Sequence, residues 1–121
     1  MKIRTMCVVV VGGVFCAGLT VLEAQALDPA KVALGRKTFE ETKCEKCHGP
    51  EGDNTKDPKL SLVEGPITKL SAADIRKWIV SPAEMTAKLP RKPKEAMKKF
   101  DLTEAQVDGL VAYVQSLSKK K

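Results

Sequence analysis

The stretch Cys44-Glu45-Lys46-Cys47-His48 decides the fold of this 121-residue chain. The spacing C-x-x-C-H is the pattern by which a haem is covalently attached to a protein. Two thiols add to the two vinyl groups of one porphyrin, and the histidine directly after the second thiol lies beneath the iron and coordinates it. We therefore predict one haem c, bound through Cys44 and Cys47, with His48 as the proximal iron ligand.

A C-x-x-C pair also occurs in thioredoxin-like redox sites and in zinc sites. A structural zinc needs four Cys or His ligands, but His48 is the only histidine, and the only further cysteines are Cys7 and Cys16 near the N-terminus. A thioredoxin-like pair needs a βαβ context, and the chain has no such pattern. Haem attachment is therefore the stronger interpretation of the motif.

The N-terminal 26 residues have the pattern of a secretory signal peptide. A basic start, an apolar run and a small-residue cleavage site follow one another at Lys2 and Arg4, at 6–22 and at Ala24-Gln25-Ala26. Cleavage would leave only the two cysteines that the haem consumes. We predict a signal peptide at 1–26 and a periplasmic or secreted domain at 27–121, with an uncleaved membrane anchor as the alternative.

Three helices are predicted after the signal segment, and no period-2 strand is seen. Their expected ranges are 28–43, 71–81 and 103–118. Each range starts with a capping signal: Asp28 followed by proline, Ser71, and Thr103 in a Thr-Glu-Ala-Gln capping box. Residues 49–70 and 81–101 are rich in turn-forming residues and are predicted to be irregular. We expect an all-α domain of three or more helices, packed around a covalently bound haem, with long loops.

The size of the domain also favours a bound cofactor. Roughly 95 residues remain after cleavage, which is at the small end for a domain that folds without a disulfide, metal or cofactor. A porphyrin adds a large flat apolar surface to the core, so the apoprotein is expected to be poorly folded.

The chain is basic, with a net charge of +6, of which +5 remains after residue 26. Positive charge gathers at Lys88, Arg91, Lys92, Lys94, Lys98 and Lys99. Such a patch predicts docking with acidic redox proteins, and a solvated loop without a dedicated role is the alternative. No nucleic-acid-binding motif accompanies the charge.

The chain after residue 26 resembles a small bacterial class I c-type cytochrome. The resemblance is carried by Gly35 with Phe39 ahead of the C-x-x-C-H motif, Trp78-Ile79 on the middle helix, Met97 and Phe100 as Met-x-x-Phe, and Leu102-Thr103 opening a last helix that contains Leu110-Val111-Ala112-Tyr113. In that family the first and last helices cross at the glycine and are locked by aromatic and leucine side chains. The matching positions here are Gly35, Phe39, Leu110 and Tyr113.

The remaining haem contacts come from this resemblance. Because His48 is the only histidine, the distal iron ligand is a methionine, a lysine, water or nothing. The resemblance implies Met97, with Met85 as the alternative. It implies that the Pro58 carbonyl accepts the second ring N–H of His48, with Pro50 or a plain turn proline as the alternatives. It also implies that Trp78 lines the haem and donates its indole N–H to a propionate, with a core position as the alternative.

Histidine and methionine together fill both axial positions of a haem iron, and the thioether raises its reduction potential. The sequence therefore predicts a monomeric periplasmic carrier of single electrons and not an enzyme. Two alternatives remain: a five-coordinate haem protein that binds gas or peroxide, and a haem subunit of a larger dehydrogenase.

Overall fold

The structure, a computed structural model, describes residues 27–118, so the predicted signal peptide at 1–26 lies outside the described residues. The described residues form helices joined by irregular segments, and they contain no strand. Its elements are α1 (Pro29–Glu41), α2 (Glu45–His48), the 3-10 helix η1 (Pro66–Lys69), α3 (Ala72–Val80), α4 (Pro82–Ala87) and α5 (Glu104–Ser118). The predicted all-α class is confirmed.

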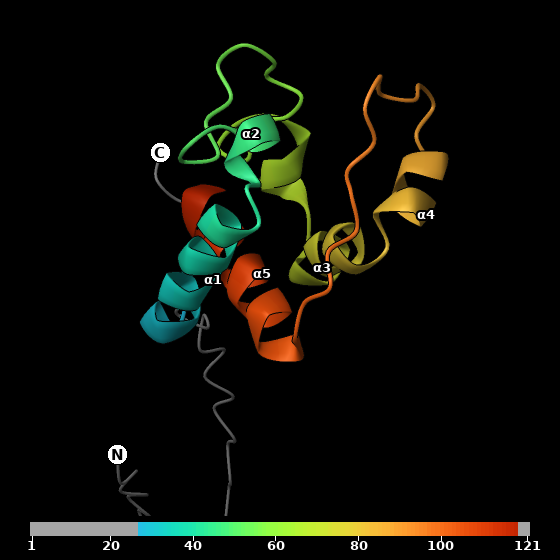
Figure 1. The fold of residues 1–121 in the computed structure, drawn as a ribbon. Helices are drawn as coiled ribbons and strands as arrows, with labels where there is room; N and C mark the ends of the chain where they lie inside the picture. Colours follow the sequence, from blue (N-terminus) through green and yellow to red (C-terminus); the bar gives the residue numbers. More distant parts are fainter. Residues whose placement is uncertain (1–26, 119–121) are drawn as a thin grey trace, which may run out of the picture.

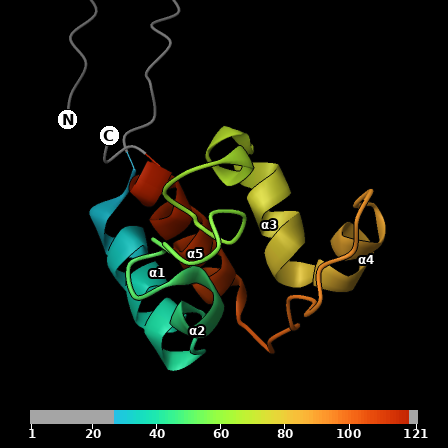
Figure 2. The same ribbon diagram turned by 90° about the horizontal axis from the view of Figure 1, so that it is seen from above.

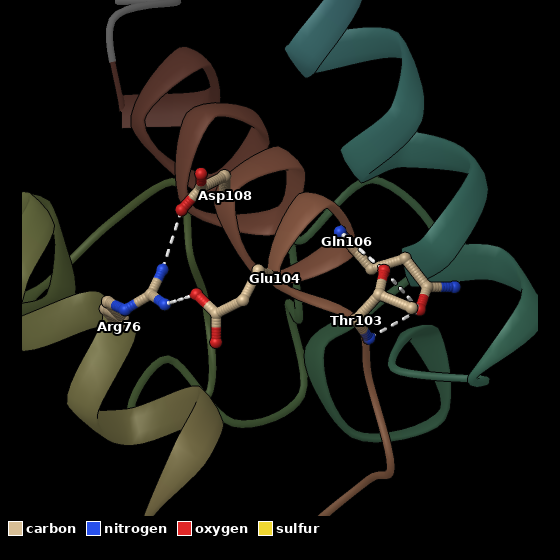
Figure 3. Close-up of polar contacts among 5 residues, drawn as sticks. All are labelled: Arg76, Thr103, Glu104, Gln106 and Asp108. Carbon is tan, nitrogen blue, oxygen red and sulfur yellow. Dashed lines mark hydrogen bonds and ion pairs between the residues drawn. The ribbon is translucent and has the colours of Figure 1, made fainter.

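The three predicted helices correspond to α1, α3 and α5, and their capping residues act as expected. The Asp28 carboxylate accepts the N–H two residues later, and the Ser71 hydroxyl accepts the N–H three residues later. At α5 the capping box is reciprocal, because Thr103 N–H donates to the Gln106 side chain at 2.9 Å and Gln106 N–H donates to the Thr103 hydroxyl at 3.3 Å (Figure 3). Local hydrogen bonding therefore fixes all three starts.

The prediction that 49–70 and 81–101 are irregular throughout is wrong at two places. Pro66 begins η1 and Pro82 begins α4, each at the first helical positions. Proline is favoured there because its fixed φ suits a helix and its missing N–H would have no partner. The N–H of Met85 closes the first turn of α4 on the Ser81 carbonyl at 3.2 Å. Both prolines start helices, and α3 ends before Pro82 as predicted.

Helices α1 and α5 cross at two buried glycines. A Cβ on Gly35 would collide with the carbonyl oxygen of Gly109, and a Cβ on Gly109 would lie 2.9 Å from the backbone nitrogen of Gly35. Beside the crossing, the rings of Phe39 and Tyr113 pack edge to face with centroids 5.4 Å apart. The predicted helix contact is confirmed for Gly35, Phe39 and Tyr113, and Leu110 is buried in the same core cluster.

The core lies along α5, which runs between α1 and α3 in both views (Figures 1 and 2). Its buried members are Phe39, Leu62, Ile75, Ile79, Val107, Leu110, Val111, Tyr113, Val114 and Leu117. Outside the core, the Arg76 guanidinium joins α3 to α5 by pairing with Glu104 and, at 2.6 Å, with Asp108 (Figure 3). No helix in residues 27–118 is long and apolar enough to cross a membrane.

Candidate functional site

The end of α1 positions the first cysteine of the motif. Lys43 has a φ of +58°, its N–H donates to the Glu40 carbonyl at 3.1 Å, and the N–H of Cys44 donates to the Phe39 carbonyl at 3.0 Å. This pair of bonds is a Schellman turn, which ends a helix through one left-handed residue. The backbone of Cys44 is thereby tied to Phe39, whose side chain is only 2% exposed in the core.

The motif itself forms the single turn α2. Both thiols are free, that of Cys44 half-buried and that of Cys47 exposed. Residues three apart lie on one side of a helical turn, so the two thiols share a face. The Cys44 sulfur lies 3.1 Å from the Thr42 hydroxyl, which already donates to the Thr38 carbonyl, so the thiol is the donor. Burial raises the pKa of Cys44.

One hydrogen bond orients the imidazole of His48. Its Nδ1 lies 2.7 Å from the carbonyl oxygen of Leu60. Because a carbonyl oxygen only accepts, Nδ1 carries the proton and Nε2 keeps its lone pair. Burial lowers the pKa of His48, and the bond to Leu60 partly opposes this effect. The ring is therefore neutral at pH 7, which is the form that coordinates a metal.

The acceptor for His48 corrects a prediction, because it is the Leu60 carbonyl and neither that of Pro58 nor that of Pro50. The Pro58 carbonyl faces the N–H of Ser61, which lies 3.3 Å from it in a turn. That turn brings the carbonyl two residues after Pro58 to the ring. Pro58 is itself exposed, and its role is to shape the turn.

The loop after the motif folds back onto it through Asn54. The Asn54 side chain donates from Nδ2 to the Cys47 carbonyl at 2.6 Å, and its N–H donates to the His48 carbonyl at 3.0 Å. Gly49 makes this approach possible, since its φ is +88° and a Cβ there would lie 2.8 Å from the Asn54 nitrogen. Sequence reasoning missed Asn54, for which the turn composition of Gly-Asp-Asn is the only signal.

The other predicted haem residues lie on separate elements. Trp78 is in α3, Met85 in α4 and Met97 in the irregular segment 88–103. Segment 88–103 leads from α4 to the start of α5 (Figures 1 and 2). The structure thus brings Cys44, Cys47 and His48 together in one turn and holds Trp78 and Met97 on other parts of the fold.

The residues present fit a haem. A neutral histidine with a free Nε2 follows two free thiols in one turn. Four large apolar side chains are half-buried and are neither members of the core cluster nor packed against it: Trp78, Met85, Met97 and Phe100. Half-exposed aromatic and thioether groups of this kind suit an apolar partner surface. Within residues 27–118 no cluster of three His, Cys, Asp or Glu side chains is arranged to hold a bare metal ion.

Comparison with known proteins agrees with this chemistry. The family model for cytochrome c matches residues 32–118, a range that includes every described site residue named above. The comparisons with curated proteins and with solved structures found no significant match.

Proposed function

This chain belongs to the cytochrome c family, whose members transfer electrons on haem, and we propose that it is a small bacterial class I member carrying one haem c on Cys44 and Cys47. The observation that carries the proposal is the geometry of His48, whose Nδ1 is held by Leu60 while Nε2 is free in the same turn as the thiols. A bound haem supplies a one-electron Fe(III)/Fe(II) couple. Leu60 orients the imidazole, and the thiols fix the haem beside it.

Met97 is the distal ligand in this proposal, and Met85 is not. Met97 is half-buried in segment 88–103, which leads into α5, and the resemblance to c-type cytochromes implies a methionine ligand at this place in the chain. A thioether in the second axial position excludes small ligands and raises the reduction potential. Trp78, half-buried in α3, would line the haem and donate its indole N–H to a propionate.

The surface charge supports acidic redox proteins as partners. Residues 88–99 contain six basic residues and one acidic residue, whereas residues 27–87 contain ten of each and residues 100–121 contain three of each. All six cations of the basic segment 88–99 are exposed. Of these six, Lys88 alone forms an ion pair with a described residue, and its partner is Glu84. Attraction of this kind steers encounter and weakens with salt.

The site and the N-terminal sequence together support a monomeric carrier of electrons and not an enzyme. A haem held by both His48 and Met97 would leave no position on the iron for a substrate. The signal-peptide pattern at 1–26 supports a periplasmic location, where the mature protein passes electrons between a donor and an acceptor.

The absorption spectrum of the ferric protein, expressed with haem-attachment machinery, tests the proposal. We expect the weak far-red band that sulfur bound to iron produces, its loss in Met97→Ala and its retention in the matched control Met85→Ala. Loss in Met85→Ala alone would move the ligand to α4. Absence of the band from the wild type, with a ferrous spectrum that changes on addition of carbon monoxide, would overturn the carrier function in favour of an open iron.

A further inference from the structure

One asparagine side chain links the two backbone segments that hold His48. Asn54 donates from Nδ2 to the Cys47 carbonyl at 2.6 Å and from its N–H to the His48 carbonyl at 3.0 Å. These carbonyls lie at the C-terminal end of α2, where a helix cannot pair its own acceptors. Asn54 therefore completes the hydrogen bonding of the turn that carries the motif.

The same side chain also organises the chain that follows it. Its Oδ1 accepts the backbone N–H groups of Lys56 and Asp57, both at 2.9 Å, which is an Asx-type turn. The Asp57 carbonyl then accepts the N–H of Leu60 at 2.9 Å, and the Leu60 carbonyl accepts Nδ1–H of His48 at 2.7 Å. These hydrogen bonds therefore connect the backbone carbonyl of His48 to its own imidazole ring, through Asn54, Asp57 and Leu60.

The position of the Leu60 carbonyl depends on two anchors. On its C-terminal side, Leu62 is 5% exposed in the core, and its N–H donates to the Gly52 carbonyl at 2.6 Å. On its N-terminal side, Asn54 ties the loop to α2. Leu60 itself lies in a turn and not in a regular helix, so its carbonyl is held in place by these neighbours.

We infer that Asn54 is a positioning residue for the proximal iron ligand, acting through the backbone to hold the Leu60 carbonyl on Nδ1 of His48. The inference rests on the proposed function, since His48 matters to electron transfer only as an iron ligand. A hydrogen bond from Nδ1–H fixes the ring and makes Nε2 a stronger electron-pair donor to iron. A stronger donor favours Fe(III), so loss of Asn54 raises the reduction potential.

The test compares Asn54→Ala and Asn54→Asp with Thr55→Ala in the haem-loaded protein. Alanine removes every side-chain bond of Asn54. Aspartate keeps the acceptor for the Asx-type turn but sets a carboxylate oxygen against the Cys47 carbonyl, and it provides a folded variant if alanine does not. Thr55 is an exposed neighbour in the same loop and serves as the matched control.

Two quantities are measured: the proton chemical shift of Nδ1–H of His48 in the diamagnetic ferrous protein, and the midpoint potential. We expect an upfield shift in both Asn54 variants, a higher potential in Asn54→Ala, and neither change in Thr55→Ala. The potential of Asn54→Asp is left out of the comparison because its new charge also acts on the iron.

A wild-type chemical shift in both Asn54 variants, together with a wild-type potential in Asn54→Ala, would overturn the inference, even if the variants unfold at lower temperature, because Asn54 would then only stabilise the loop. The proposed function fails on a different observation. A wild-type ferric spectrum without the far-red band contradicts histidine and methionine ligation whatever Asn54 does.

Discussion

The crossing of α1 with α5 and the region formed by α4 and segment 88–103 are built in opposite ways. At the crossing, two glycines touch, and Phe39 and Tyr113 pack ring against ring. In the second region Met97 is half-buried outside the core, and Leu89 is 37% exposed. The protein thus completes one half of its interior with its own side chains. We propose that the cofactor completes the other half.

The largest effect is expected from removing both attachment thiols, with Cys44→Ala and Cys47→Ala combined. Without haem the second region has no apolar partner, so we expect loss of the cooperative thermal transition. Hydrogen exchange by mass spectrometry checks the comparison, since amides of segment 88–103 should lose protection before those of α5. Equal loss in both regions would mean that they do not differ in their dependence on haem.

Gly35→Ala is expected to disrupt the crossing of α1 with α5. The added methyl meets the Gly109 carbonyl, so the helices must move apart, and we expect the free energy of unfolding to fall by about 3 kcal/mol. Urea denaturation of the haem-loaded protein measures the change. Ala33→Gly, on the exposed face of α1, is the control and should cost about 1 kcal/mol through helix propensity alone. A smaller loss in Gly35→Ala than in the control would contradict close packing at the crossing.

The same substitution, threonine to valine, is expected to have opposite effects on stability in the two regions. Thr38 in α1 is fully buried, and its hydroxyl donates to the Leu34 carbonyl at 2.9 Å. Thr86 in α4 is 9% exposed, and its buried hydroxyl has no hydrogen-bond partner among the described residues. We expect Thr38→Val to destabilise the protein by about 1 kcal/mol and Thr86→Val to stabilise it by about 1 kcal/mol. Thermal unfolding midpoints of the two variants should shift in opposite directions, and shifts of the same sign would remove the contrast.

The smallest effect is expected at Lys43, where α1 passes into the motif. Its φ of +58° favours glycine, so Lys43→Gly should stabilise the protein by about 0.5 kcal/mol after the added freedom of the unfolded chain is counted. Lys46→Gly, in α2, is the control and should destabilise it. Differential scanning calorimetry resolves the sign of each change. A destabilising Lys43→Gly would argue against the Schellman turn.

The sequence predicts features that depend on near neighbours in the chain. Asp28, Ser71 and Thr103 start helices through bonds that span two or three residues, and each prediction is confirmed. The resemblance to class I c-type cytochromes likewise predicts the helix contact through Phe39, which is buried against Tyr113.

Some features are not predicted, or are predicted at the wrong residue. The partner of Gly35 is Gly109, and nothing in local composition says which two glycines will touch. The acceptor for His48 is Leu60 and not Pro58, because the choice between carbonyls two residues apart is made by the geometry of the turn. The helix α4 is not predicted, because a proline that ends one helix can also begin the next, as Pro82 does here.

The uneven charge along the chain has a consequence for how single molecules lie on a surface. After residue 26, the basic segment 88–99 carries the whole net excess, since the residues on either side of it contain equal numbers of acids and bases. All six cations of this segment are exposed, so the segment forms a positive patch on the surface. On a carboxylate-coated electrode the molecule should adsorb with this patch down. A monolayer would then exchange electrons at nearly uniform rate, and neutralising that patch would broaden the voltammetric wave.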